Sequence, residues 1–210
     1  MSHETDLRKT MRIVTAKELQ NWLDNGQVLE QDSRGPKVVR LADGSFLKIF
    51  HSRKPLLSRW RPEARRFARN AEKLRALGIP TPKVLECCWL EQKRSTSACL
   101  YNPLQGTPLD ILFRERREEF DSELPNFVAF IRQLHLRGIY FRSLHLGNVL
   151  KLPYGNFGLI DFLDLHFKGA PLSRSLIRRN FVHLKNYLER RQVQDFPWKR
   201  LMECYERDSN

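Results

Sequence analysis

The chain has 210 residues, of which 41% are hydrophobic, enough for one compact domain with a substantial core. No apolar run approaches the roughly 18 residues of a membrane-spanning helix, and the polar N-terminus shows no secretory signal. The four cysteines form no CxxC pair and no metal-ligand spacing with the histidines, which favours reduced thiols. These features exclude collagens, coiled coils, secreted disulfide scaffolds and integral membrane proteins. They favour a cytoplasmic protein.

The charge is strongly unbalanced, since 37 Lys and Arg against 24 Asp and Glu give a formal net charge of +13. Such an excess is typical of proteins with a polyanionic partner, which can be nucleic acid, an anionic membrane surface or a phosphorylated substrate. The basic residues concentrate in residues 59–69 and 174–185. Solvated basic faces are the alternative interpretation of these stretches. Nucleic acid is the weaker candidate partner, suggested by charge alone, because exposed aromatic interleaving of the base-stacking type is not evident in these stretches.

The first half of the chain predicts a β-rich region with two helices. Thr15 and Glu18 form a capping box that opens a short helix, which Gly26 closes. Apolar residues at helical period then predict a long helix from Pro62 to Gly78. Extended segments are predicted at residues 27–30, 37–41, 45–50, 84–89 and 98–101.

Beyond Pro103 the pattern changes to helices. An amphipathic helix over residues 124–134 ends at Gly138, and a hairpin of two short apolar runs follows it. Two further helices are predicted, at residues 172–191 and 198–205. The order predicts an α+β fold with a polar tail (1–12), a small β-rich half (13–103) and a mostly helical half (104–210). A cleft between two such halves is a natural ligand site.

Four residues stand at the spacings that phosphoryl transfer from ATP requires. Lys48 lies within a predicted strand, and Glu63 on the following helix can pair with it and hold it against nucleotide phosphates. Asn148 and Asp161 lie at the mouths of two short strands, where an amide and a carboxylate can chelate Mg²⁺ between phosphate oxygens. The alternative interpretation is a solvated edge-strand lysine, a capped turn and a strand-end aspartate.

Residues 134–150 resemble the catalytic loop of protein-kinase-like enzymes, and residues 157–162 resemble the strand and metal-binding Asp-Phe-Gly element that follow that loop. The sequence Leu-His-Leu-Gly-Asn at residues 144–148 is more similar to small-molecule kinases. Glu-Ala-Arg at 63–65 and Leu-Gly-Ile-Pro-Thr-Pro at 77–82 resemble bacterial lipopolysaccharide core kinases of the Kdo/heptose type, a group that includes toluene-tolerance proteins. The resemblance covers about residues 28–162.

The resemblance implies a protein-kinase-like, two-lobed fold that transfers phosphate from ATP to a sugar of the lipopolysaccharide core. Lys48, Glu63 and Tyr101, the last at the start of a hinge-like segment, would bind ATP. Asn148 and Asp161 would bind Mg²⁺. The anionic partner would be the lipopolysaccharide core or a lipid A precursor, met in the cytoplasm or at the cytoplasmic face of the inner membrane.

The chain departs from the kinase pattern in three places. It has no GxGxxG loop, Leu163 stands where the Asp-Phe-Gly element has glycine, and Ser143 stands at the position of the catalytic aspartate. A serine hydroxyl is not a carboxylate base at neutral pH, so His145 or Asp164 would have to accept the proton. The same substitution favours an alternative function, a pseudokinase that binds nucleotide or regulates a partner without catalysing transfer.

Overall fold

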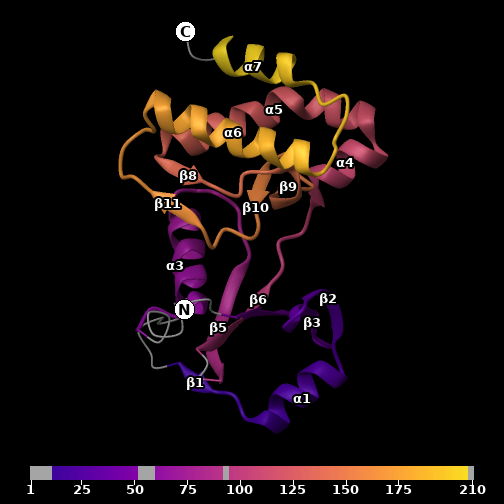
Figure 1. Ribbon diagram of the computed structural model, residues 1–210, viewed down its shortest axis with the longest axis vertical. Helices are drawn as coiled ribbons and strands as arrows, with labels where there is room; N and C mark the ends of the chain where they lie inside the picture. Colours follow the sequence, from indigo (N-terminus) through magenta and orange to yellow (C-terminus); the bar gives the residue numbers. More distant parts are fainter. Residues whose placement is uncertain (1–10, 52–59, 92–94, 208–210) are drawn as a thin grey trace. The chain divides into compact units, whose positions relative to one another are not determined.

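The computed structural model describes residues 11–51, 60–91 and 95–207 and is of mixed α+β type (Figure 1). The chain divides into two compact units. The first, called the sheet unit, comprises residues up to 76 together with 81–104. The second, called the helical unit, comprises residues 77–80 and 105 onward. Within the described ranges, no helix is both long and apolar enough to cross a bilayer.

The sheet unit is built on a six-stranded sheet in the order β1-β5-β6-β4-β3-β2. All neighbours are antiparallel except β1 and β5. The strands are β1 (Arg12–Ile13), β2 (Gln27–Asp32), β3 (Gly35–Arg40), β4 (Phe46–Phe50), β5 (Lys83–Glu91) and β6 (Thr96–Asn102). Arg12, which the sequence places in the polar tail, is therefore part of a strand. Residues 1–10 lie outside the described residues.

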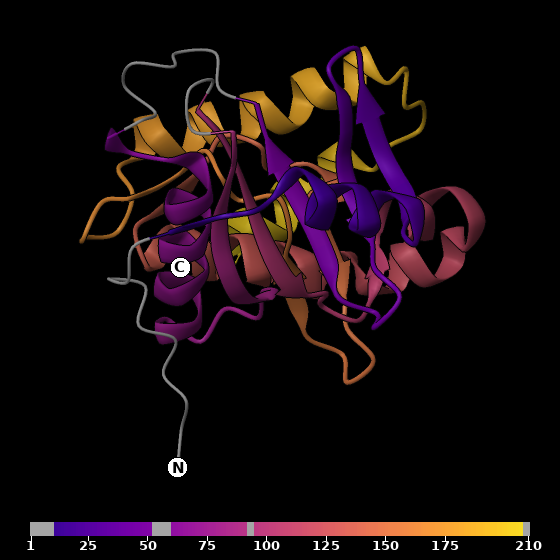
Figure 2. The same ribbon diagram turned by 90° about the horizontal axis from the view of Figure 1, so that it is seen from below.

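Two helices cover opposite faces of this sheet, as the alternation of side chains along β4 shows. Leu47 and Ile49 pack with apolar residues of α1 (Ala16–Asp24), whereas Phe50 packs against Phe67 of α3 (Glu63–Ala76). Because successive strand residues point to opposite faces, Lys48 lies on the α3 side. Figure 2 shows the sheet with these helices from a second direction. The five predicted strands and both helices of this region are confirmed, each within a few residues of its expected ends.

The N-terminus of α1 uses only half of the expected capping box. The Thr15 hydroxyl accepts a hydrogen bond from the Glu18 backbone N–H at 3.1 Å. The Glu18 carboxylate does not return to Thr15 but pairs with the Arg12 guanidinium at 2.7 Å. An ion pair with a neighbouring strand thus replaces the second, local bond of the motif.

The helical unit contains four helices and two small sheets among its described residues. The helices are α4 (Leu109–Glu115), α5 (Arg117–Leu136), α6 (Arg174–Arg190) and α7 (Trp198–Arg207). One sheet has the order β10-β9-β7 and the other pairs β11 with β8. These strands are β7 (Thr107–Pro108), β8 (Ile139–Phe141), β9 (Val149–Lys151), β10 (Phe157–Leu159) and β11 (Leu165–Phe167).

The sequence predicted α5, α6 and α7 but missed the shortest elements. Gly138 ends α5 as expected, with φ of +68°, a conformation that glycine adopts without strain. The helix begins seven residues earlier than predicted, at Arg117; its first turns include the buried Phe120, and Pro125 lies inside it. The strands β1, β7, β8 and β11 are two or three residues long, too short to show a periodic pattern.

Candidate functional site

The loop that resembles a kinase catalytic loop runs from the end of β8 to the start of β9. A turn returns the chain after β8, since the Leu144 N–H donates to the Phe141 carbonyl at 3.1 Å. A single 3-10 turn, Leu146–Asn148, follows. The buried Asn148 side chain closes the loop, because its Nδ2 donates to the Ser143 carbonyl at 3.1 Å. Ser143 and Asn148 are therefore held in a fixed relation by the loop itself.

Asp161 reaches the same place from the end of the β9–β10 hairpin. The Ile160 N–H donates to the Asn148 carbonyl at 3.0 Å, so the residue before Asp161 is bonded to Asn148. Asp161 is exposed and has φ of +49°. Aspartate is one of the few residues besides glycine that adopts this left-handed conformation readily. The chain thus turns sharply at the exposed Asp161, directly after the residue that is bonded to Asn148.

Asp164 is the direct partner of Ser143. The Ser143 Oγ donates to Asp164 Oδ2 at 2.7 Å. The second oxygen, Oδ1, is buried and has no hydrogen-bond partner in the described part of the chain. Asp164 is therefore a carboxylate beside the loop with one oxygen free to accept a hydrogen bond. Burying such an oxygen without a partner destabilises the folded protein, so the arrangement needs an explanation.

His145 lies in the same cluster but is held differently. Its ring stacks on the Tyr187 ring of α6, with centroids 4.2 Å apart and an interplanar angle of 8°. Its Nδ1 is buried and has no hydrogen-bond partner among the described residues. Burial lowers the pKa of His145, although the negative charges of Asp161 and Asp110 raise it in part. His145 is therefore neutral at pH 7 and has one unused ring nitrogen.

The sheet unit holds the three residues expected to bind nucleotide. Lys48 lies on β4, an interior strand, which removes the explanation of a solvated edge-strand lysine. Its Nζ is 5.9 Å from the ring centroid of Phe67, which is one helical turn beyond Glu63 on α3. Glu63 is half-buried in the first turn of that helix. Lys48 and Glu63 therefore lie near the same end of α3.

Tyr101 is placed less favourably for a side-chain role. Its ring is buried, 8% exposed, and packs against Phe46 and Phe67 with centroids 5.7 and 6.0 Å away. The ring is thus part of the packing between β6 and α3. A contact with nucleotide at this position would use the Tyr101 backbone.

Asn148 and Asp161 suit Mg²⁺ by the chemistry of their donor atoms. Since Nδ2 of Asn148 is bonded to Ser143, the side-chain oxygen is the atom left for a ligand. An amide oxygen and a carboxylate are hard donors of the kind that Mg²⁺ binds together with phosphates and water. In the described ranges, no group of three or more His, Cys, Asp or Glu side chains could hold a metal ion. A magnesium ion here would depend on phosphate oxygens for the rest of its ligands.

No protein-family model matches the chain, and no curated protein matches it at a significant level.

Sequence reasoning named Ser143 and Asp164 separately but missed that they are bonded to each other. It also missed Tyr187, the stacking partner of His145. Asp164 follows Asp161 by three residues, and this short separation is a weak sequence signal that the two carboxylates lie in the same region. Tyr187 gave none, because it lies on a separate helix 42 residues beyond His145.

Proposed function

We propose that the protein is an ATP-dependent phosphotransferase that phosphorylates a sugar of the lipopolysaccharide core. The observation that carries the reaction class is the cluster in the helical unit, where the residue before Asp161 is bonded to Asn148 and Ser143 of the same loop as Asn148 is bonded to Asp164. The substrate class rests on the sequence resemblance. In this proposal the two units correspond to the two lobes of a kinase-like fold.

Each side chain has a role in the proposed reaction. Lys48, oriented by Glu63, binds the phosphates of ATP; Asn148 and Asp161 would hold Mg²⁺, which would supply positive charge to the transferred group. The acceptor hydroxyl attacks the γ-phosphorus, the bond to the β-phosphate oxygen breaks, and ADP leaves. Asp164 accepts the proton of the acceptor hydroxyl, and Ser143 positions Asp164 through the 2.7 Å hydrogen bond.

A pseudokinase is the second candidate, and one observation favours it. Asp164 Oδ1, the oxygen that would act as the base, is shielded from solvent in this structure. If that oxygen stays shielded when substrate is present, the cluster binds Mg·ATP without transferring phosphate. Both candidates require Lys48, Asn148 and Asp161 to bind nucleotide, so they differ only in turnover.

Nucleotide binding is tested by thermal unfolding with and without Mg·ATP. A ligand that binds only the folded state stabilises it by about 2.7 kcal/mol at a hundred times its Kd, which is easily measured as a rise in Tm. The wild type and the Lys83→Met control, altered at an exposed lysine of β5, should both show the rise. Lys48→Met and Asp161→Asn should lose it while keeping the Tm of the free protein. A wild type that gains no stability from Mg·ATP would contradict both candidates.

Turnover is tested by transfer of labelled γ-phosphate from ATP to purified core oligosaccharide. The phosphotransferase proposal predicts transfer that is lost in Asp161→Asn and retained in Lys83→Met. Transfer at background level in the wild type, combined with a clear Tm rise, would support the pseudokinase instead.

A further inference from the structure

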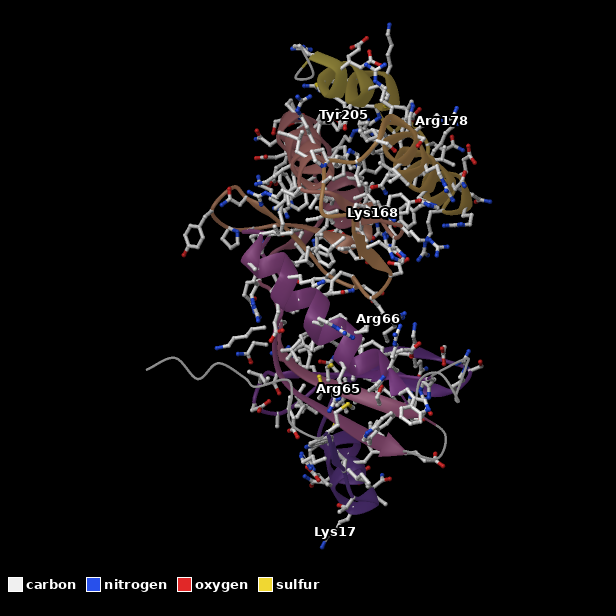
Figure 3. All side chains as sticks on the ribbon, turned by 90° about the vertical axis from the view of Figure 1, so that its left-hand side faces the viewer. Lys17, Arg65, Arg66, Lys168, Arg178 and Tyr205 are labelled. Carbon is white, nitrogen blue, oxygen red and sulfur yellow. The ribbon has the colours of Figure 1, made fainter. Side chains whose placement is uncertain are left out.

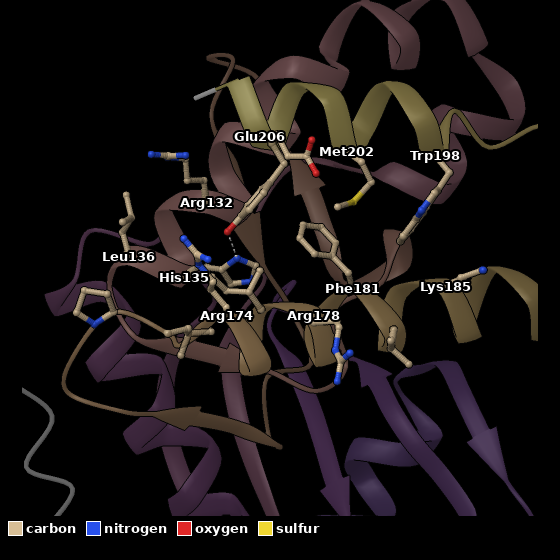
Figure 4. A pocket seen from close by; sticks show the side chains of 15 residues that line it. Arg132, His135, Leu136, Arg174, Arg178, Phe181, Lys185, Trp198, Met202 and Glu206 are labelled. Atoms are coloured by element: carbon tan, nitrogen blue, oxygen red, sulfur yellow. Dashed lines mark hydrogen bonds between the residues drawn. The ribbon is translucent and has the colours of Figure 1, made fainter. Parts of the chain in front are cut away.

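A cavity of about 660 Å³ lies among α5, α6 and α7 of the helical unit (Figure 4). None of the residues that line it belongs to the cluster around Ser143. Its size is within the roughly 300–1,000 Å³ that is usual for small-molecule sites in proteins. The proposed phosphotransferase reaction makes no use of it.

The floor and one wall of the cavity are apolar. Phe181 of α6 is the central side chain, with edge-on ring contacts to Trp198 at 6.2 Å and Tyr205 at 4.9 Å between centroids. Met202 of α7 lies beside it (Figure 4). At the mouth, the apolar side chains of Leu136 and Val182 are 55% and 47% exposed. The apolar surface therefore continues from the cavity to the outside.

His135 forms part of the floor but adds no positive charge at neutral pH. Its Nε2 donates to Asn180 Oδ1 at 3.1 Å. Its Nδ1 accepts from the Tyr205 hydroxyl at 2.7 Å, the bond drawn as a dashed line in Figure 4. Burial lowers the pKa of His135 to about 4. The floor is thus neutral and its polar atoms are already satisfied.

The rim of the cavity is strongly cationic. Of the described residues that line it, four are basic and only Glu206 is acidic. The basic residues are Arg132, Arg174, Arg178 and Lys185. Arg174, Arg178 and Lys185 are exposed on α6, where Figure 3 labels Arg178. A desolvated apolar floor under a cationic rim matches a ligand with an apolar body and an anionic head.

We propose that this cavity binds an anionic lipid by a single acyl chain, with the chain over Phe181 and Met202 and the headgroup at Arg174 and Arg178. Charge complementarity and the exposed apolar mouth select this class of ligand. An acidic amphipathic helix is a weaker candidate, because helix recognition needs an extended groove with anchors at several turns rather than one concave cavity. The proposal does not depend on phosphoryl transfer.

The test is isothermal titration calorimetry with dodecyl phosphate below its micelle-forming concentration. Dodecylphosphocholine, which has no net charge, and inorganic phosphate, which has no chain, serve as the two partial ligands. Dodecyl phosphate should bind at least about tenfold more tightly than either, because each partial ligand lacks one of the two complementary contacts.

Matched charge variants locate the binding. Arg174→Glu/Arg178→Glu should weaken dodecyl phosphate at least about tenfold. Arg179→Glu/Arg190→Glu makes the same change in net charge at exposed positions of α6 outside the cavity lining and should change affinity less than about threefold. Met202→Glu should weaken the chain contact without touching the rim. The Tm of each variant shows that it is folded.

Three results would overturn the proposal. The first is equal affinity for dodecyl phosphate and inorganic phosphate. The second is an equal loss in the two charge variants. The third is binding of an acidic amphipathic peptide, but not of dodecyl phosphate, at this cavity.

Discussion

Two regions of the helical unit are each built on a histidine–tyrosine pair, and they treat the histidine in opposite ways. In the α5–α6–α7 cavity, both ring nitrogens of His135 are hydrogen-bonded, to Tyr205 and Asn180. In the loop after β8, His145 is stacked on Tyr187 and its buried Nδ1 has no hydrogen-bond partner in the described structure. Burial lowers the pKa of both rings, so both are neutral at pH 7.

The difference separates a histidine whose hydrogen bonds are all made from one in the cluster that we propose to be catalytic. A satisfied buried histidine ties elements together, and Asn180 extends the tie by donating from Nδ2 to the Phe141 carbonyl at 2.5 Å. Native proteins rarely leave a buried polar atom unpaired, and such atoms concentrate where ligands bind. The cluster around Ser143 has two of them, His145 Nδ1 and Asp164 Oδ1.

The largest expected effect is on turnover in Asp164→Asn. Loss of a general base lowers kcat by about 10²–10⁴-fold, and the isosteric amide preserves the packing. Ser143→Ala should cost less, because it removes only the hydrogen bond that positions Asp164. Both are measured as kcat at saturating Mg·ATP. Undiminished turnover in Asp164→Asn would remove Asp164 from the chemistry.

The structure also changes the expectation for Ser143→Asp. By sequence alone, a restored carboxylate should raise turnover if the serine weakens a working kinase, and should leave turnover at background if the protein is a pseudokinase. However, Asp164 Oδ2 is 2.7 Å from the Ser143 hydroxyl, so the new carboxylate would lie against an existing one. Two adjacent carboxylates do not both ionise readily. We therefore expect the pH–rate profile of Ser143→Asp to shift to higher pH, with no gain in kcat at pH 7.

The next effect is on stability against pH, and it depends on His135. Its pKa is about 4 in the folded protein against 6.5 for the ordinary side chain. Between these two pH values the unfolded chain binds a proton at His135 and the folded protein does not. This contribution to stability is therefore present above pH 6.5 and is lost as pH falls through about 4. A difference of this size corresponds to at most ~3 kcal/mol. Urea unfolding from pH 7 to pH 4 should show a loss that is smaller in His135→Gln than in the wild type.

The smallest effects compare the two rings directly by replacing each with phenylalanine. His135→Phe removes the hydrogen bonds of His135 to the Tyr205 hydroxyl and to Asn180 Oδ1 and should destabilise the protein by about 1–3 kcal/mol. His145→Phe keeps the stack on Tyr187 and removes an unpartnered nitrogen, so stability should change by less than about 1 kcal/mol. Urea unfolding at pH 7 measures both. Equal losses in the two variants would mean that the contrast between the rings has no energetic basis.

His145→Phe also reports on the chemistry. If Asp164 is the base, turnover should fall less than about tenfold, well short of the loss expected for a missing base. A fall as large as that of Asp164→Asn would assign the proton transfer to His145.

The sequence alone determined the elements that repeat at a regular period. The apolar spacing on residues 63–76 and 174–190 is visible within one helix, because each residue's burial is decided by its position on that helix. The alternation of side chains between the two faces of β4, around Lys48, is also decided by position within that one strand. The order of Lys48, Glu63, Asn148 and Asp161 is likewise a property of the sequence, and so is the absence of an aspartate at position 143.

Only the tertiary structure decided which distant residues meet. Ser143 bonds to Asp164 across 21 residues, and His135 bonds to Tyr205 across 70. The cavity among α5, α6 and α7 exists only because three separate helices pack together. A local pattern encodes which face of an element is apolar but not which other face it meets, since long-range contacts depend on how the whole chain closes. The partners of Ser143 and His135 therefore had to come from the folded chain.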